Sequence, residues 1–395
     1  MKHTKILVAA AAVLFAAVNL HAQKLHVINY CNTLDTSIGT QADLERIIKH
    51  SMEIAGALKY EFNYTEGVDE ECSREKLMAD LNNLQCGKED IVLFYYSGHG
   101  MRSDKDKSPF PQMCLKYEGY EQEKWVPVHT VVEKLRSKGA RLTLVITDCC
   151  NSIDSYVTAK SKSPMSKDGG TIDSKVVENI KKLFLGQKGV VVATSSKAGQ
   201  PSAGSSKSGG FFSSVLFEYS LYKASIGKLP TTWQDVLSDV NRVFNANPVR
   251  YANEDGTTYE VVQEPYFEVA VTATNEPAQQ TPVATATNTA SETTATVISV
   301  DSKFATELSR ILNNRLPRIE RLNLAEELSR RYFSADAKVA TVGRNGTTIV
   351  EYEKAYDWLH RLASSKRIQS VNIIHEGKND RGLRNYIKVQ EIHNN

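Results

Sequence analysis

Short apolar segments alternate with amphipathic helical segments from Lys24 to Val271, and this alternation limits the folds open to the chain. Residues 90–98 and 141–147 are almost continuously apolar, as expected for strands buried on both faces of a parallel sheet. Strand–helix alternation of this kind predicts an α/β sandwich with a mainly parallel central sheet, which we assign to residues 23–271. The pattern predicts strands at 25–30, 59–64, 90–98, 141–147, 189–195 and 266–271, and helices at 42–58, 73–84, 128–139, 174–185, 211–224 and 231–245.

The composition changes abruptly after residue 271. Residues 272–300 hold no aromatic side chain and only two charged ones, and Thr and Ala dominate them. Such a segment cannot bury enough apolar surface to fold, so we predict a flexible linker. Residues 301–395 are predicted to form a small α+β domain, with helical patterns at 304–333 and 353–364 and strand patterns near 337–343, 347–352, 370–377 and 384–393.

The amino-terminal segment has the layout of a secretory signal peptide. Lys2 and Lys5 precede an unbroken apolar run from Ile6 to Val18, and small and polar residues follow up to Ala22. An apolar helix of about 13 residues spans only about 20 Å, too short for a membrane anchor. We therefore expect residues 1–22 to be removed and the mature protein to be exported, periplasmic or secreted, without a transmembrane segment.

Charge and cysteine content argue against two classes of function. Lys and Arg total 48 against 46 acidic residues, and without residues 1–22, which hold two lysines and no acid, the totals are equal at 46. A balanced charge argues against nucleic acid as the main partner. The six cysteines are scattered, and the helix predicted between Cys72 and Cys86 would hold these two about 18 Å apart, beyond disulfide reach. No Cys or His spacing is typical of zinc, so no metal is predicted.

Two of the buried strands are followed directly by reactive residues. His99 comes after strand 90–98 in FYYSGHG, and Cys149 and Cys150 come after strand 141–147 in VITDCCNS. Because active sites gather at the carboxyl ends of strands in open parallel sheets, we expect the two segments to meet. A lone His or Cys is more often structural. Two strand-end motifs in the order His then Cys, 51 positions apart when counted to Cys150, favour a catalytic pair.

A thiol and an imidazole together can cleave a peptide bond. The thiol attacks a carbonyl as a thiolate, so a neighbouring imidazole must help to remove its proton, and the imidazole later protonates the leaving amine. The glycines on either side of His99 allow backbone amides to approach the carbonyl oxygen as it becomes negatively charged. His99 and one of the two adjacent cysteines are therefore candidates for a peptidase dyad.

These motifs resemble those of the caspase-like cysteine peptidases, and most closely those of the metacaspase and related bacterial branch. YSGHG and TDCC are similar to the Ser-Gly-His-Gly and Asp-x-Cys-His-Ser-Gly strings of that branch, and ATSSKAGQPSAG followed by GGFFSSVLFEYSL resembles its small-subunit region. The resemblance covers about residues 24–271 and implies a caspase-like αβα sandwich that hydrolyses protein or peptide substrates. Aligning Asp148 with the family's aspartate makes Cys150 the nucleophile and His99 the general acid and base. The amides of Gly100 and Cys150 then serve the oxyanion.

The sequence departs from the family pattern just after the nucleophile. Asn151 and Ile153 stand where the family usually has His and Gly, so the loop is expected to differ in shape. Some metacaspases use calcium, and calcium stimulation is an implication of the resemblance alone. Asp104, Asp106 and Asp154 are interpreted as solvated loop residues because no set of acids has the spacing of the family's calcium site. We predict no cofactor and no calcium dependence.

The resemblance also implies a substrate specificity. Metacaspase-like members line the pocket for the residue before the scissile bond with acids and cut after Arg or Lys, and Asp148 matches their pocket residue. A carboxylate suits the planar fork of a guanidinium group. Ser97 is expected to add a hydrogen bond to the substrate. Asp43 is either a second pocket acid or a carboxylate at the amino end of a helix, and the second interpretation is favoured.

Two further regions have open roles. Residues 155–171 are rich in Ser, Lys and Gly and are predicted to form a surface loop. Lys160, Lys162 and Lys167 make it either a site of self-cleavage, as in some relatives, or an ordinary solvated loop. Residues 301–395 resemble, in pattern only, the cone-shaped domains related to nuclear transport factor two, with a ligand-binding, dimerising or targeting role.

Two alternatives stay open at this stage. The chain is either an active peptidase or a catalytically inactive caspase-like module that binds a peptide or a partner protein, although His99 and the cysteines are all present. Within the peptidase hypothesis, Cys149 is the weaker candidate for the nucleophile. The natural substrate, the route of activation and the oligomeric state do not follow from the sequence.

Overall fold

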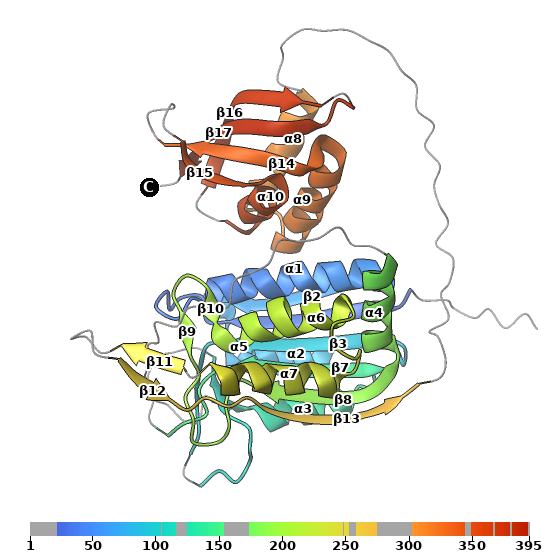
Figure 1. The fold of residues 1–395 in the computed structure, drawn as a ribbon, viewed down its shortest axis with the longest axis vertical. Coiled ribbons are helices and arrows are strands. Elements are labelled where there is room, and N and C mark those ends of the chain that lie inside the picture. Colours follow the sequence, from blue (N-terminus) through green and yellow to red (C-terminus); the bar gives the residue numbers. More distant parts are fainter. Residues whose placement is uncertain are drawn as a thin grey trace, which may run out of the picture. The chain divides into compact units, whose positions relative to one another are not determined.

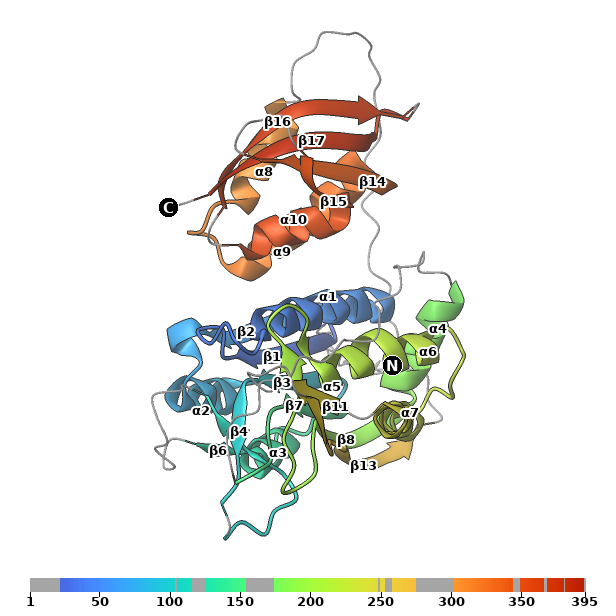
Figure 2. The ribbon, with the colours of Figure 1, turned by 60° about the vertical axis from the view of Figure 1, so that its left-hand side comes forward.

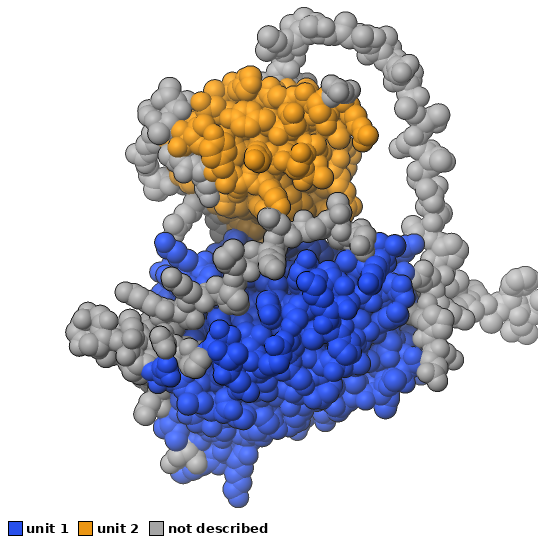
Figure 3. Space-filling view, in the orientation of Figure 1, with its two compact units in different colours: residues 1–284 blue, residues 285–395 orange. Residues whose placement is uncertain are grey.

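The chain divides into two compact units, residues 1–284 and residues 285–395 (Figure 3). The predicted signal peptide up to His21, the loop with Lys160, Lys162 and Lys167, and the predicted linker after Thr274 lie outside the residues that the structure describes. The structure is a computed structural model that describes residues 22–103, 105–115, 125–153, 174–247, 249–252, 258–274, 302–343, 349–365, 368–379 and 381–393.

A six-stranded sheet forms the centre of the first unit (Figure 1). Its strands lie in the order β13-β8-β7-β3-β1-β2, and every neighbouring pair is parallel except β8 with β13. The predicted α/β sandwich with a mainly parallel central sheet is therefore confirmed. The strands are β1 (Lys24–Cys31), β2 (Glu61–Val68), β3 (Ile91–Ser97), β7 (Leu142–Asp148), β8 (Gln187–Thr194) and β13 (Tyr266–Ala273).

Helices cover both faces of this sheet (Figure 2). α1 (Thr40–Leu58), α4 (Ser174–Leu185), the helical segment from Phe211 to Ser225 and α7 (Trp233–Ala246) pack together on one face. The segment from Phe211 to Ser225 consists of α5 (Phe211–Ser213), a π-helical stretch (Ser214–Ser220) and α6 (Leu221–Ser225). On the other face lie α2 (Arg74–Asn83) and α3 (Val128–Arg136). Every residue of β3 and β7 is buried between the two layers, which explains why their sequences are apolar without alternation.

Several short strands were not predicted, because two to four residues carry no readable period. After β3, the segments β4 (His99–Met101), β5 (Gln112–Cys114) and β6 (Val126–Pro127) form a small antiparallel sheet. The other short strands form two hairpins, β9 (Gly204–Ser205) with β10 (Gly209–Gly210) and β11 (Val249–Ala252) with β12 (Thr258–Val261). The strand predicted at 59–64 was placed too early. Lys59 ends α1 with a φ of 60°, so β2 begins only at Glu61.

The cysteines agree with one prediction made from the sequence. All six cysteines are free thiols, so Cys72 and Cys86 are not bonded to each other. Among the described helices, none combines the length and the apolar character that are needed to cross a bilayer.

The second unit packs three helices against a four-stranded sheet with the order β15-β14-β17-β16. The helical pattern predicted over 304–333 is two helices, since the first ends at Ile311 and Pro317 stands just before the start of the second. The resemblance to the nuclear-transport-factor-two domains stays a prediction. The elements are α8 (Ser302–Ile311), α9 (Arg318–Tyr332), β14 (Phe333–Val342), β15 (Ile349–Lys354), α10 (Ala355–Ser364), β16 (Ile368–Lys378) and β17 (Arg384–His393).

Candidate active site

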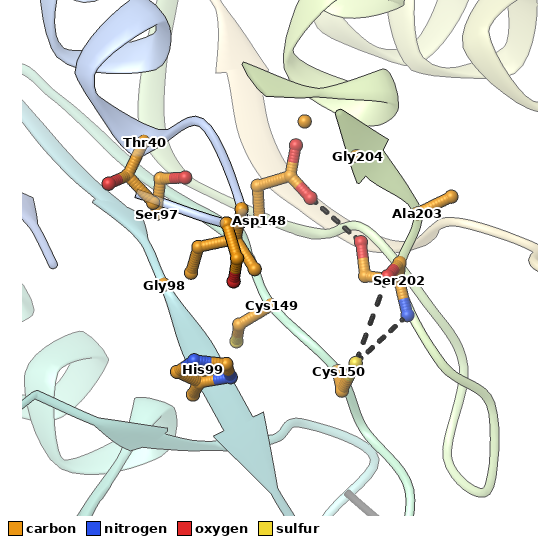
Figure 4. A pocket seen from close by; sticks show the side chains of 13 residues that line it. Thr40, Ser97, Gly98, His99, Asp148, Cys149, Cys150, Ser202, Ala203 and Gly204 are labelled. Carbon is orange, nitrogen blue, oxygen red and sulfur yellow. Dashed lines mark hydrogen bonds between the residues drawn. The ribbon is translucent and has the colours of Figure 1, made fainter. Parts of the chain in front are cut away.

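A pocket lies where the central parallel strands of the first unit end, and Figure 4 shows the side chains around it. Its wall comes from the segments that follow β1, β3, β7 and β8, together with the β9–β10 hairpin. The lining residues are Ser37, Ile38, Thr40, Ser97, Gly98, His99, Asp148, Cys149, Cys150, Ser202, Ala203, Gly204 and Gly210. The two motifs that the sequence singled out therefore lie in one pocket.

Neighbouring strands bring His99 and Cys150 to this pocket. β3 and β7 pair in parallel with Ser97 opposite Asp148, so the residues that follow each strand emerge side by side. The N–H of Gly98 donates to the Asp148 carbonyl at 3.3 Å, which continues the pairing beyond the strand ends. The histidine and the cysteine are thus positioned by the sheet itself.

An acid that the sequence analysis missed binds His99. The distance from His99 Nε2 to Asp35 Oδ2 is 2.7 Å. Asp35 lies four positions after the end of β1, and β1 is the neighbour of β3 in the sheet. A polar residue shortly after a buried strand was the only signal of this role in the sequence. Strand order, which brings the ends of β1 and β3 together, was not readable from it.

The thiol of Cys150 is half-buried and hydrogen-bonded to the backbone of Ser202 (Figure 4). The Ser202 N–H lies 3.3 Å from the sulfur, and the sulfur lies 3.8 Å from the Ser202 carbonyl oxygen. Burial raises the pKa of the Cys150 thiol, and the Ser202 N–H only partly offsets this effect. The resting thiol is therefore protonated near neutral pH and needs a base when it reacts.

Cys149 has a different environment from Cys150. Its exposed fraction is 2%, and burial raises the pKa of its thiol well above the usual range. Its backbone is held by Ser195, whose hydroxyl accepts from the Cys149 N–H at 3.1 Å and donates to the Cys149 carbonyl at 2.9 Å. A thiol buried this deeply is a poorer nucleophile than the half-buried one beside it.

Gly100 lies against the backbone of the two cysteines. A Cβ at this position would come within 2.4 Å of the Cys150 carbonyl oxygen and within 2.6 Å of the Cys149 sulfur. Only glycine therefore allows β4 to approach the segment Cys149–Cys150 this closely. Gly100 and Cys150 are therefore neighbours, and the predicted role of their amides at an oxyanion stays a prediction.

Asn151 holds the loop that follows Cys150. Its side chain is fully buried, donates to the carbonyls of Pro109 at 2.9 Å and Ser196 at 3.2 Å, and accepts from Arg102 at 2.8 Å. Its backbone also pairs with Gln200 in an isolated bridge. This residue was recognised from the sequence only as a departure from the family pattern, and the structure gives it a structural role.

Replacing Asn151 with alanine is expected to lower the free energy of unfolding by about 1–3 kcal/mol, because buried hydrogen-bond partners lose their counterpart. Urea unfolding of the full chain measures the change. The exposed Asn83 in α2 offers a matched control, since Asn83→Ala is expected to change stability by no more than about 0.5 kcal/mol. Equal stability of both variants would contradict this role of Asn151.

Two buried carboxylates lie near His99 and Cys150. Asp148 lines the pocket and accepts from the Ser202 hydroxyl at 2.8 Å, and from the Ser213 hydroxyl at 2.7 Å and the Ser213 N–H at 2.9 Å. Asp43 lies deeper, in the first turn of α1, and is not itself part of the pocket wall. It accepts from the Ser97 hydroxyl at 2.7 Å.

Asp43 lies at the amino end of a helix, as the favoured interpretation had it, and its role as a second pocket acid stays a prediction. Its carboxylate also lies close to that of Asp148. Asp43, Asp148 and Glu218, which all interact with Arg46, are called the acidic cluster below. Gly210 donates its N–H to Asp43 at 2.9 Å, and a Cβ on Gly210 would come within 1.9 Å of the Asp148 carboxylate. The glycine therefore leaves room for both acids. Ser97 donates to Asp43, so its hydroxyl is engaged inside the protein as well as facing the pocket.

One arginine serves this acidic cluster. Arg46 contacts Asp43 directly, donates to Glu218 at 3.0 Å and to the Ser208 carbonyl at 2.7 Å, and is 8% exposed. Burial raises the pKa of Asp43 to about 7, even though Arg46 opposes the shift, and the neighbouring Asp148 adds to it. Burial also raises the pKa of Asp148. The cluster is therefore short of positive charge.

The described residues contain no group of three or more His, Cys, Asp or Glu side chains placed to hold a metal ion. Of the acids considered for calcium, Asp104 and Asp154 lie outside the described residues. Asp106 accepts from the Ser108 N–H at 2.9 Å and from the Gln112 amide at 3.2 Å.

Comparison with protein families identifies a domain in this chain. A family model described as the caspase domain matches residues 27–289, which is more than half of the chain. No curated protein gives a significant match. The matched region contains every residue of the pocket.

Proposed function

The chain belongs to the caspase-domain family of cysteine peptidases, and on this premise we propose that it is an endopeptidase that cuts after Arg or Lys through Cys150 and His99. One observation carries the proposal. A thiol, an imidazole and a buried carboxylate, contributed by Cys150, His99 and Asp148, line the same pocket at the carboxyl edge of the sheet. These are the groups that a thiol peptidase with a basic specificity requires.

In the proposed reaction, Cys150 begins as a neutral thiol. As its sulfur attacks the carbonyl carbon of the scissile bond, His99 takes the thiol proton, and the carbonyl oxygen becomes an oxyanion that the amides of Gly100 and Cys150 stabilise. The C–N bond then breaks, and His99 gives the proton to the leaving amine. Water, deprotonated by His99, hydrolyses the remaining thioester and restores the thiol.

The acidic cluster supports the proposed specificity. Arg46 lies close to Asp43, Asp148 and Glu218, and among the described residues it is the cation that contacts this cluster, whose member Asp148 also borders the pocket. A guanidinium or ammonium group of a substrate would supply the missing positive charge. Charge pairs in a partly buried site are stronger than on the surface, so this contact can select the residue before the scissile bond.

Binding of a small guanidinium compound is expected to weaken as the pH falls from 8 to 6. Since burial raises the pKa of Asp43 to about 7, the Asp43–Asp148 pair takes up a proton over this range and attracts a cation less strongly. The inhibition constant of agmatine, measured against cleavage of an arginine peptide at several pH values, reports the effect without depending on acylation of the thiol.

The matched variant is Asp43→Asn, which keeps the size of the side chain but removes one of the two titrating groups. Its agmatine inhibition constant is expected to vary less with pH than that of the wild type. An inhibition constant independent of pH in the wild type, or the same pH dependence in both proteins, would contradict the proposed pocket.

We also propose, from the sequence, that residues 1–22 direct export and that the loop with Lys160, Lys162 and Lys167 is cut by the enzyme itself. We propose as well that the chain belongs to the metacaspase branch, which would account for both the basic specificity and the self-cleavage. The charge pattern supports protein or peptide substrates rather than nucleic acid. Residues 301–395 are proposed to act outside the chemical step, because the dyad lies wholly in the first unit.

A further inference from the structure

We propose that Asp35 is a positioning residue that holds the imidazole of His99 in the tautomer and orientation needed to deprotonate Cys150. The inference rests on the proposed function, in which His99 is the base. The family match identifies a domain but says nothing of a third residue behind the dyad. The hydrogen bond from His99 Nε2 to Asp35 Oδ2, at 2.7 Å, is the observation that carries the proposal.

The loop that carries Asp35 is fastened to the body of the protein on several sides. The Asn32 N–H donates to the Ser97 carbonyl at 3.0 Å, and the Thr40 hydroxyl donates to the Asn32 carbonyl at 2.7 Å. Near its other end, Gly39 has a φ of 70°, and a Cβ there would lie 2.0 Å from the Ser205 carbonyl oxygen. A loop held at both ends can keep a carboxylate in one place.

The Asp35 carboxylate is itself held in one orientation. The N–H of Ser37 donates to Asp35 Oδ1 at 2.9 Å, and the Ser37 hydroxyl donates to the same oxygen at 2.6 Å. The second oxygen, Oδ2, is therefore the one directed to His99. Partial burial works against the charged form, but the hydrogen bonds from Ser37 and His99 outweigh it, so the pKa of Asp35 lies below its usual range.

The chemistry follows from these contacts. An ionised carboxylate only accepts hydrogen bonds, so His99 Nε2 must carry the proton in that bond. In the neutral ring, Nδ1 is then the basic nitrogen, and it is this atom that takes the proton of Cys150. When the ring becomes positively charged during attack, the adjacent Asp35 stabilises it, as the third member of a Ser-His-Asp triad does.

The same geometry makes Asp35→Asn a sharp test. The two donors of Ser37 would hold the carbonyl oxygen of the new amide at the place of Oδ1, so its NH₂ group would face His99. An amide N–H donates, so the ring would have to accept at Nε2 and carry its proton on Nδ1 instead. That tautomer cannot take a proton from Cys150 at Nδ1.

We would measure kcat and KM for an arginine peptide with the full chain and with its Asp35→Asn, Asp35→Ala and Glu45→Gln variants. Glu45 is a matched control because it is a carboxylate of α1 that accepts from Gln41 and not from His99. We expect kcat to fall by about 100-fold or more in both Asp35 variants, the size of the contribution of a positioned base, with KM nearly unchanged. Glu45→Gln is expected to keep the wild-type kcat.

A second readout does not depend on turnover. The ¹⁵N spectrum of the His99 ring, assigned by comparison with His99→Gln, reports which nitrogen carries the proton. We expect Nε2 in the wild type and Nδ1 in Asp35→Asn. A merely structural role of Asp35 would not move this proton.

The outcomes separate this inference from the proposed function. If peptides are cleaved and both Asp35 variants keep the wild-type kcat, the role of Asp35 is wrong while the peptidase proposal stands. If no protein cleaves any peptide but the ring proton moves in Asp35→Asn, Asp35 does set the tautomer and the peptidase proposal fails. If the ring proton stays on Nε2 in Asp35→Asn, the inference is overturned whatever the activity.

Discussion

Replacing Cys150 with alanine is expected to abolish peptide cleavage, with a loss in kcat/KM of about 10⁴-fold or more, because the variant has no atom that can form the thioester. The measurement uses residues 23–395 and fluorogenic peptides that end in Arg, Lys or Asp. Cleavage after Arg or Lys by the wild type, but not by Cys150→Ala, would support Cys150 as the nucleophile.

Mass spectrometry of the same two proteins reports self-cleavage near Lys160, Lys162 and Lys167, which only the wild type is expected to show.

Cys149→Ala is the matched control for this experiment. It removes the same atom from the neighbouring residue, whose thiol is buried and has a raised pKa. We expect Cys149→Ala to keep cleaving arginine peptides, with its main effect on stability. Loss of activity in Cys149→Ala alone would make Cys149 the nucleophile. A wild type that cuts none of the peptides, with or without calcium and prior nicking, would favour the inactive binding module.

Asp148→Asn is expected to lower kcat/KM for arginine and lysine peptides by about 100-fold or more. The amide has nearly the volume of the carboxylate but no charge, so a buried substrate cation would lose its counterion. Asparagine can also keep an oxygen toward the hydroxyl and N–H of Ser213, which now donate to Asp148. The ratio of kcat/KM for peptides that end in Arg to that for peptides that end in a neutral residue measures the effect.

Glu218→Gln provides the control for the change of charge. Glu218 is a third carboxylate beside Arg46, but it does not line the pocket. Its loss removes the same charge at a greater distance from the substrate, so we expect the ratio for Arg over neutral peptides to change much less than in Asp148→Asn. If both variants lower the ratio equally, the total negative charge of the acidic cluster selects the substrate, and Asp148 does not contact the substrate cation in particular.

Much of the fold could be predicted because its signal is local. The buried runs that became β3 and β7 contain enough consecutive apolar residues to be recognised without any knowledge of their partners. The same holds for the helices that cover them, whose apolar positions recur at the helical period. Pro317 carried a local signal too, but it was not used when the pattern over 304–333 was interpreted as one helical stretch.

That His99 and Cys150 lie in one pocket could be predicted from the sequence for a related reason. His99 and Cys150 follow strands that were predicted, and parallel strands end at a common edge. Asp35 could not be found in this way, because its role depends on β1 lying next to β3. Arg46 and Ser213 are further cases, since an amphipathic helix pattern does not say which polar side chain will reach a buried acid.

The sequence by itself determined which residues are buried in strands, which reactive residues follow those strands, and that a thiol and an imidazole should meet at one edge. Local periodicity and residue chemistry are sufficient for these statements. Only the tertiary structure decided that Asp35 binds His99, that Cys150 is more open than Cys149, and that Asp43 shares Arg46 with other acids. These features depend on strand order and on the packing of segments far apart in the chain, for which a single sequence carries no local signal.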